Sequence, residues 1–446
     1  MRIVYQRCCG LDVHQKSVTA CLLLIDEHGE YTVEKGRFGT MTRDLRRLAD
    51  WLHAQGVRRV AMEATGVYWK PVWNILEQRG EFELLLANPQ HIQNVPGRKT
   101  DQKDSEWIAD LLQHGLLRGS FVPPLAILQL RDLTRMRANL RQDHAALANR
   151  IQKILQDANI KLASVASDVF GVSGRKMLKA LLMGQEKPEE LAKLALGKLR
   201  EKREDLELAL EGQLTDHHRF QMRHLLELFD FVEGKIGTVE GEIRRLLGRL
   251  EEPGPGQTPS TRGAGDEGCG SSTGVVSRLE AAVNLWKMIP GVNEITASIL
   301  AAEIGVNMDQ FASAGHLASW AGLCPGNRES AGKRLSGKTR KGNVWLRRAL
   351  CQAAWAASRT KNTYLSALYR RFVVRKGSKK AIVAVAHTIL VSAYHMLKKQ
   401  CGYEELGADY FDRLDKNALE RRLVKRLISL GNEVTLRPIA AEACTS

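Results

Sequence analysis

An apolar stripe in the middle of the chain limits the folds that are possible. Apolar side chains recur over residues 222–250 at steps that alternate between three and four residues: Met222, Leu225, Phe229, Val232, Ile236, Val239, Ile243, Leu246 and Leu250. This spacing puts them on one face of a long helix. A similar stripe runs from Leu133 to Ala158 and is broken near His144. The two stripes predict either an antiparallel helical hairpin or an intermolecular coiled coil. We expect a helical coiled-coil arm over residues 126–250 that dimerises.

Residues 1–125 show a different pattern, in which strand-like and helix-like runs alternate. Three β-branched or apolar runs come first, "RIVYQRCCGLDV", "SVTACLLLID" and "YTVEKGRFG", and they predict strands in hairpin order. "TRDLRRLADWLHAQG" predicts a helix that begins on a Thr42 cap and ends at Gly56. Two further strands and two further helices follow, so the expected order is βββαβαβα. This order predicts an α/β domain with a mixed sheet flanked by helices.

The remaining chain divides at a segment rich in Gly, Pro, Ser and Thr. Residues 251–278 contain this segment and predict a flexible linker. Residues 279–402 predict a mainly α-helical domain, and residues 403–446 predict a peripheral segment. Within the helical domain, "MIPGVNEITASILAAEIG" predicts two helices joined by a tight turn. The turn is either a helix-hairpin-helix element that binds a nucleic-acid phosphate or a purely structural turn.

Basic residues are concentrated in one stretch of the chain. The net charge is +16, and residues 326–380 hold sixteen Lys or Arg against a single acid, Glu329. A solvated surface normally mixes both signs, so this stretch predicts contact with a nucleic acid. The eight cysteines follow no CxxC spacing, so they predict neither a disulfide framework nor a zinc site. The apolar runs are too short to span a bilayer. We therefore expect a cytoplasmic protein with no membrane role.

Four acidic residues are candidates for a metal site. Asp12 and Glu63 lie at the ends of two predicted strands, and Asp101 and Asp104 lie in the first turn of a predicted helix. Strand ends and a neighbouring helix start can meet at one edge of a sheet. Clustered carboxylates repel one another unless a cation holds them, and oxygen ligands suit Mg²⁺ or Mn²⁺. The alternative is that Asp101 and Asp104 only complement the helix dipole, which is the simpler interpretation for either residue alone.

A second candidate site is the basic, Gly-rich segment 323–348. Ser330 lies there beside Arg328, Lys333 and Arg334, where cations and backbone N–H groups could hold a phosphate close to its hydroxyl. The residues alone favour a basic loop whose serine only contacts phosphate, and Ser336 competes for any catalytic role. The candidate nucleic-acid contacts are Lys99, Lys103, Arg328, Lys333, Arg334, Lys338, Arg340, Lys341, Arg347 and Arg348. His14, His144, His387 and His395 follow no ligand spacing and predict ordinary structural or surface positions.

Six segments of the chain resemble the motifs of one family. "GLDVHQKSVTACLL", "AMEATGVYW" and "KTDQKDSEWIADLL" resemble the blocks of a RuvC-like, RNase H-like domain with a DEDD acidic tetrad. "IPGVNEITASILAAEIG", "LASWAGLCPGNRESAGK" and "RKGNVWLRRAL" resemble the second domain of the same proteins. These are the insertion sequence 110 transposases, also called bridge-RNA-guided recombinases. The loop at Ser330 differs from the family pattern, which has a Ser-Ser-Gly-Gly core.

The resemblance implies roles that the residues alone do not establish. It implies that Asp12, Glu63, Asp101 and Asp104 bind Mg²⁺ and that Ser330 is the nucleophile of a DNA transposase. It further implies double-stranded DNA at the element ends and the target as substrate, a structured guide RNA as partner, and a homo-oligomer, either a dimer or a tetramer. Two alternatives remain at this point. One is a RuvC-like, structure-selective DNA endonuclease that uses the acids alone, and the other is a nucleic-acid-binding protein without enzymatic activity.

Overall fold

A computed structural model describes residues 3–25, 29–64, 66–89, 92, 104–185, 187–248, 272–326, 328–330, 333–339 and 341–436. Residues 272–277, 328–330, 333–335 and 418 are described by their backbone alone. The chain forms two compact units, Met1–Pro123 and Pro124–Ser446. Each unit has buried cores of its own, and the units are described separately below.

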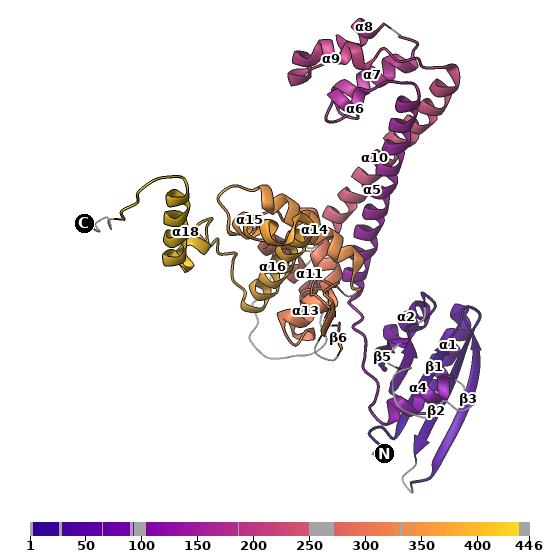
Figure 1. Cartoon of the computed structure of the whole chain (residues 1–446). Coiled ribbons are helices and arrows are strands. Elements are labelled where there is room, and N and C mark those ends of the chain that lie inside the picture. The colour runs from indigo at the N-terminus through magenta and orange to yellow at the C-terminus, as the bar shows by residue number, and fades with distance from the viewer. Residues whose placement is uncertain are drawn as a thin grey trace, which may run out of the picture. The chain divides into compact units, whose positions relative to one another are not determined.

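The first unit is built on a five-stranded mixed sheet (Figure 1). The strands are β1 (Arg7–Val13), β2 (Ser17–Ile25), β3 (Tyr31–Gly39), β4 (Arg59–Glu63) and β5 (Glu83–Ala87). Their order in the sheet is β3-β2-β1-β4-β5, with β1 antiparallel to β2 and parallel to β4. The helices are α1 (Thr42–Ala54), α2 (Trp69–Arg79) and α4 (Asp104–Gln113). The predicted order βββαβαβα is confirmed over the described residues.

Helices cover both faces of this sheet. Leu45 and Leu48 of α1 and Leu76 of α2 share one core with Leu11 of β1. On the opposite face, α4 packs its Ile108, Ala109 and Leu112 against Cys8 of β1 and Ala61 of β4. A strand that is buried on both faces has a nearly continuous apolar sequence, as "CCGLDV" in β1 shows. The predicted Thr42 cap is wrong: Met41 is the N-cap of α1 and its side chain makes no capping hydrogen bond.

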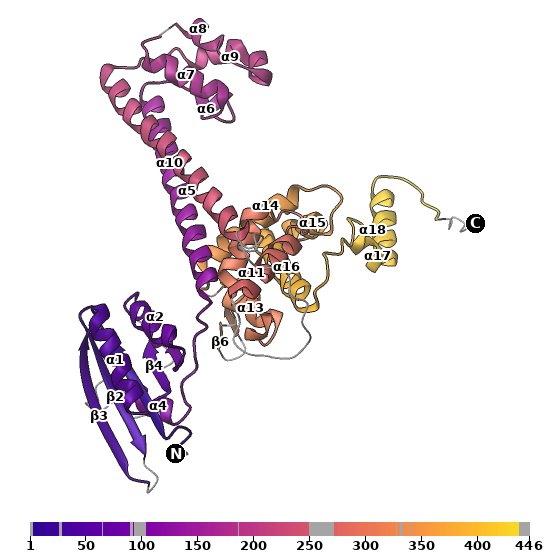
Figure 2. The same ribbon diagram turned by 180° about the vertical axis from the view of Figure 1, so that it is seen from behind.

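Two long helices of the second unit form an antiparallel hairpin within the chain. They are α5 (Leu125–Asp157) and α10 (Asp216–Gly248), and they lie side by side in Figures 1 and 2. Ile127 near the start of α5 shares a core with Ile243 near the end of α10. Ile151 near the end of α5 shares another core with Met222 near the start of α10. The intrachain hairpin is thus one of the two arrangements that the apolar stripes left open. Dimerisation of this arm remains a prediction.

Short helices join the far ends of α5 and α10. They are α6 (Leu162–Val165), α7 (Val172–Leu182), α8 (Pro188–Ala192), the 3-10 helix η1 (Gly197–Lys202) and α9 (Arg203–Ala209). Met177 and Leu178 of α7 and Leu206 of α9 are buried in the same core as Met222. The segment between the stripes is therefore a small helical cap whose core continues that of the hairpin.

The other end of the hairpin packs into the C-terminal helices. These are α11 (Ser272–Trp286), α12 (Glu294–Ile304), η2 (Met308–Gln310), α13 (Ala314–Trp320), α14 (Val344–Arg359), α15 (Tyr364–Lys376) and α16 (Ser378–Lys399), followed by α17 (Tyr410–Leu414) and α18 (Lys416–Ser429). The helix α16 is long and apolar enough to cross a membrane, but it is a core helix that contacts α11, α13, α14 and α15. The helix α11 begins at Ser272, inside the range expected for the linker; residues 249–271 lie outside the described residues.

Candidate active site

Two of the candidate acids lie side by side at one edge of the first unit's sheet. The strands β1 and β4 are parallel, and Leu11 is paired with Met62, so Asp12 and Glu63 occupy the next position on each strand. Side chains alternate between the two faces of a strand. Because Cys8 and Ala61 face α4, Asp12 and Glu63 face α4 as well. Both acids therefore lie at the carboxyl ends of adjacent strands and on one face.

A close approach of α4 to β1 brings the third acid to the same place. A Cβ atom added to Gly10 would lie 2.3 Å from the carbonyl oxygen of Ser105 and 2.4 Å from the backbone nitrogen of Ala109. The absence of a side chain at Gly10 thus lets the first turn of α4 lie directly on β1. Asp104 is the first residue of α4. Its negative charge contributes to a raised pKa of Asp12, so the two carboxylates lie within electrostatic reach of each other.

Asp12 is held in an environment that disfavours its charged form. Burial is the main cause of its raised pKa, the charge of Asp104 adds to it, and His14 opposes both. The Nε2 atom of His14 lies 3.0 Å from Oδ2 of Asp12. His14 was expected to be an ordinary structural or surface residue; it is exposed at the surface, and it also contacts this acid. Its position two residues after Asp12 puts both side chains on the same side of the extended chain, which is the signal in the sequence that could have identified it.

The described acids supply only part of the predicted metal site. Asp101, Lys99 and Lys103 lie outside the described residues. Among the residues that the structure does describe, no group of three or more His, Cys, Asp or Glu side chains could hold a metal ion. The chemistry of the donors nevertheless fits Mg²⁺, which prefers carboxylate oxygens. Asp12, Glu63 and Asp104 come from two strand ends and a helix start that share one face.

The serine of the second candidate site lies in a short β-hairpin. Its strands are β6 (Arg328–Ser330) and β7 (Lys333–Ser336), and Ser330 is paired with Lys333 at the end near the turn. Ser336 lies near the base of the hairpin, where its hydroxyl accepts a hydrogen bond from the backbone N–H of Lys338 at 3.2 Å. The competitor serine thus has a structural contact. The side chains of Arg328, Ser330, Lys333 and Arg334, and residue Arg340, lie outside the described part of the chain.

The base of this hairpin is fixed to the helical core. The backbone N–H of Gly326 donates to the carbonyl of Lys338 at 3.0 Å. A Cβ atom added to Gly342 would lie 2.4 Å from the backbone nitrogen of Gly322, so the chain after the hairpin runs directly against the end of α13. Asn343 follows and is the N-cap of α14, accepting from the N–H of Leu346 at 3.0 Å. Gly342 and Asn343 therefore position both the hairpin and α14.

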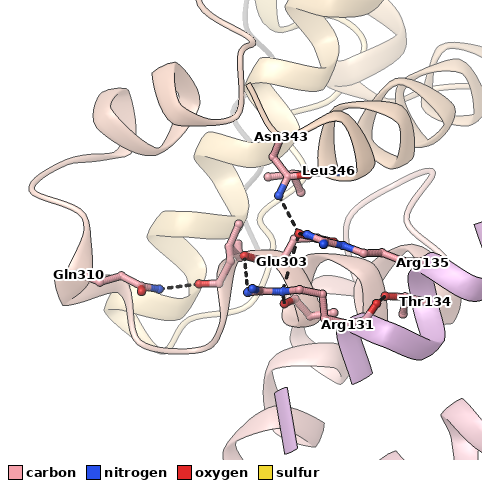
Figure 3. A network of polar contacts seen from close by, with 9 residues as sticks. Arg131, Thr134, Arg135, Glu303, Gln310, Asn343 and Leu346 are labelled. Atoms are coloured by element: carbon pink, nitrogen blue, oxygen red, sulfur yellow. Dashed lines mark hydrogen bonds and ion pairs between the residues drawn. The ribbon is translucent and has the colours of Figure 1, made fainter. Parts of the chain in front are cut away.

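Asn343 is also bonded to a buried carboxylate that our reading of the sequence missed. Its Nδ2 atom donates to Oε2 of Glu303 at 2.6 Å (Figure 3). The Glu303 side chain is 1% exposed and accepts two hydrogen bonds of 2.8 Å from Arg135. These bonds raise the pKa of Arg135. The neighbouring Arg131 donates hydrogen bonds to the backbone carbonyls of Ala302 and Glu303, and burial lowers its pKa. An acid inside the apolar run "SILAAEIG" was the available signal.

The remaining predicted contacts differ in their surroundings. Lys338, Lys341 and Arg348 are exposed, and Arg347 is partly exposed. The turn of "MIPGVNEITASILAAEIG" packs against α14, since a Cβ atom added to Gly291 would lie 2.4 Å from the carbonyl oxygen of Ala353. Packing of this turn against a helix favours the structural interpretation over a phosphate-binding hairpin.

Comparisons with known proteins match both units. A transposase model of the DEDD IS110 type matches residues 9–160, and a model described as "Transposase IS116/IS110/IS902 family" matches residues 283–370. The first range contains Asp12, Glu63, Asp101 and Asp104, and the second contains Ser330 and Glu303. A DEDD transposase domain implies an RNase H-like fold, which agrees with the mixed sheet. No curated protein matches the chain.

Proposed function

The chain is an IS110-family DNA transposase or recombinase, and from that premise we propose that it cuts and rejoins DNA with two sites. The first is an acidic site of Asp12, Glu63, Asp101 and Asp104, and the second is the hydroxyl of Ser330. The observation that carries the proposal is the arrangement of Asp12, Glu63 and Asp104 on one face of the sheet. An acid that is partly buried beside another acid is unfavourable without a cation, which is typical of a functional site.

The four acids would hold Mg²⁺ or Mn²⁺. When bound, the cation would neutralise charge on the acids and on the DNA phosphate. His14 contacts Asp12 and would keep its carboxylate oriented toward the other acids. Lys99 and Lys103 flank Asp101 in the sequence and would hold a DNA phosphate beside the site by charge-assisted hydrogen bonds.

Ser330 would form a temporary covalent bond to DNA. Its Oγ atom attacks a backbone phosphorus, and the Oγ–P bond forms while the bond from phosphorus to a sugar oxygen breaks. The serine proton passes to solvent and the departing sugar oxygen takes up a proton. In the second step, a sugar hydroxyl of another DNA end attacks the phosphoserine, which rejoins DNA and releases the serine. Basic residues around the hairpin, including Lys338 and Lys341, would stabilise the charge on phosphorus.

The partners follow from the family and the charge. We propose double-stranded DNA as substrate, a structured guide RNA that pairs with it, and a homo-oligomer in which the acidic site of one protomer acts with Ser330 of another. The basic stretch 326–380 supports nucleic-acid contact, because it holds sixteen Lys or Arg and one acid. Sequencing of RNA that co-purifies with the chain tests the RNA partner, and an RNA with segments complementary to the element ends and the target is expected.

A strand-transfer assay with serine variants tests the second site. Ser330→Ala is expected to abolish strand joining and any covalent protein–DNA product, because no other hydroxyl replaces the attacking oxygen. Ser336→Ala is the matched control and is expected to retain both. The measurement is retention of end-labelled DNA on the denatured protein, together with joined product. Joining by Ser330→Ala at the normal rate would exclude the serine mechanism.

The acidic site is tested in the same assay. Asp12→Ala, Asp104→Ala or removal of divalent cations with EDTA is expected to reduce strand cleavage by about 100-fold or more. If the acid variants lose cleavage, while the unchanged chain and Ser330→Ala cut DNA equally and neither joins strands nor links to DNA, the chain acts as a structure-selective endonuclease through the acids alone. The observation that favours this second function is that the unit Met1–Pro123, which carries the acids, has buried cores of its own.

A further inference from the structure

A cavity between three helices of the second unit carries an unusual set of side chains. It has a volume of about 470 Å³ and lies between α5, α12 and α14. Arg137 and Arg141 line it from α5, Glu303 from α12, and Trp345 and Arg348 from α14. The residues of each helix are spaced by three or four positions, so each helix turns one face to the cavity. A volume of this size admits a small organic ligand such as a nucleotide.

The charges around the cavity are unbalanced. Arg135 is neutralised by Glu303, which it contacts with two hydrogen bonds. Arg137 and Arg141 share a single carboxylate, that of Glu240, at 2.7 and 3.4 Å. Arg348 is exposed and forms no ion pair with the residues that the structure describes. The four arginines that line the cavity thus contact two carboxylates, which leaves an excess of two positive charges, and planar guanidinium groups bind phosphate well.

An aromatic ring lies among these cations. The guanidinium carbon of Arg348 lies 5.7 Å from the ring centroid of Trp345, and that of Arg135 lies 5.8 Å from it. Trp345 itself is partly exposed. Asn343 fixes the start of α14, through Leu346 and Glu303, two residues before the tryptophan. The ring is thus held in place at the wall of a cationic cavity, where a nucleobase can stack on it.

From this arrangement we propose that the cavity is a binding site for an unpaired nucleotide of a nucleic-acid strand. The base stacks on Trp345, and the adjoining phosphates bind Arg141 and Arg348. A fully paired duplex must first unpair and unstack a base before that base can enter a cavity, so the site favours single strands, loops or bulges. The inference rests on the proposed function and adds to it, because it specifies that the second unit binds nucleic acid through an unpaired nucleotide. Glu303 and Asn343 act as positioning residues for this site.

Binding of short oligonucleotides to the full chain tests the site. The probes are labelled 16-nucleotide RNA and DNA strands of one sequence and the corresponding blunt DNA duplex, measured by fluorescence anisotropy in EDTA so that no strand is cut. Trp345→Leu is expected to weaken single-strand binding by about 5- to 150-fold, as loss of one stacked base does, and to affect the duplex less. Trp345→Phe keeps an aromatic face and is expected to retain most of the affinity.

The arginines are tested by salt titration. Arg141→Gln and Arg348→Gln are each expected to reduce the slope of log affinity against log salt by about one, since each removes one phosphate contact. Arg150→Gln is the control, because Arg150 is exposed on α5 and does not line the cavity. The strand type that binds more tightly, RNA or DNA, identifies the source of the nucleotide.

Two results would overturn the inference, because a site that stacks a base on Trp345 predicts neither of them. In the first, Trp345→Leu and Arg348→Gln bind single strands as tightly as the unchanged chain does. In the second, Trp345→Leu loses duplex and single-strand affinity equally, and Trp345→Phe loses as much affinity as Trp345→Leu. Strand cleavage that depends on Asp12 would persist in both cases, so the cavity can fail without the proposed function failing.

Discussion

The charged form of the Asp12 side chain is less favourable in the folded chain than in water. Burial and the neighbouring Asp104 raise its pKa, with His14 opposing. We therefore expect Asp12→Asn to stabilise the first unit at neutral pH by about 0.5–2 kcal/mol, as removal of strain at a functional site commonly does, while strand cleavage is lost. Thermal unfolding followed at several pH values, together with the cleavage assay, measures both effects.

The pH dependence of this stabilisation has a definite sign. The raised pKa means that the contribution of Asp12 to stability is complete below the ordinary aspartate pKa of about 3.9 and is lost as pH rises through the raised value. The advantage of Asp12→Asn should thus be absent near pH 4 and grow toward pH 7. Asp143→Asn, on an exposed part of α5, is the control and should show no such growth. Mg²⁺ should raise the melting temperature of the unchanged chain more than that of Asp12→Asn.

At the scale of elements, the contact between β1 and α4 places the acids. Gly10→Ala would put a methyl group within 2.4 Å of the backbone of α4, and backbone cannot move aside as a side chain can. We expect a destabilisation of about 1–3 kcal/mol and loss of cleavage, because α4 carries Asp104. Urea unfolding and the cleavage assay measure these changes.

A second glycine and two cysteine thiols serve as controls for the Gly10→Ala test. Gly119→Ala adds a methyl group 3.5 Å from Leu85, an ordinary contact, and should change neither stability nor cleavage appreciably. Cys8 lies under α4, and burial raises its pKa to about 12, so it should react slowly with alkylating reagents. Gly10→Ala should speed that reaction and leave the exposed Cys401 unchanged. Unchanged Cys8 reactivity would contradict the close packing of α4.

At the scale of the molecule, the buried cores are divided between the two units. Ile243 of α10 is fully buried in a core of the second unit, and Leu48 of α1 is fully buried in a core of the first. Ile243→Ala should cost about 2–5 kcal/mol and lower amide protection only within Pro124–Ser446. Leu48→Ala should do the reverse. Hydrogen exchange with mass spectrometry measures both, and equal loss of protection in both units from either variant would contradict separate cores.

Local properties of the sequence were sufficient for much of the fold. The alternation of strand and helix runs predicted the order of elements in the first unit, because periodicity is a property of neighbouring residues. The Thr42 cap was wrong because helix boundaries depend on the chain that precedes them as well as on residue type. Glu303 was missed because its partners, Arg135 and Asn343, are distant in sequence.

The sequence by itself determined the long apolar faces of α5 and α10, the strand ends at Asp12 and Glu63, and the concentration of positive charge in residues 326–380. Only the tertiary structure decided that α10 packs on α5 of the same chain, since an apolar stripe does not specify its partner. It also decided that Asp12 and Glu63 share the face covered by α4. Both faces of β1 are buried, so the alternation that would reveal a solvent-facing side is absent from its sequence, and only packing against α4 distinguishes the two.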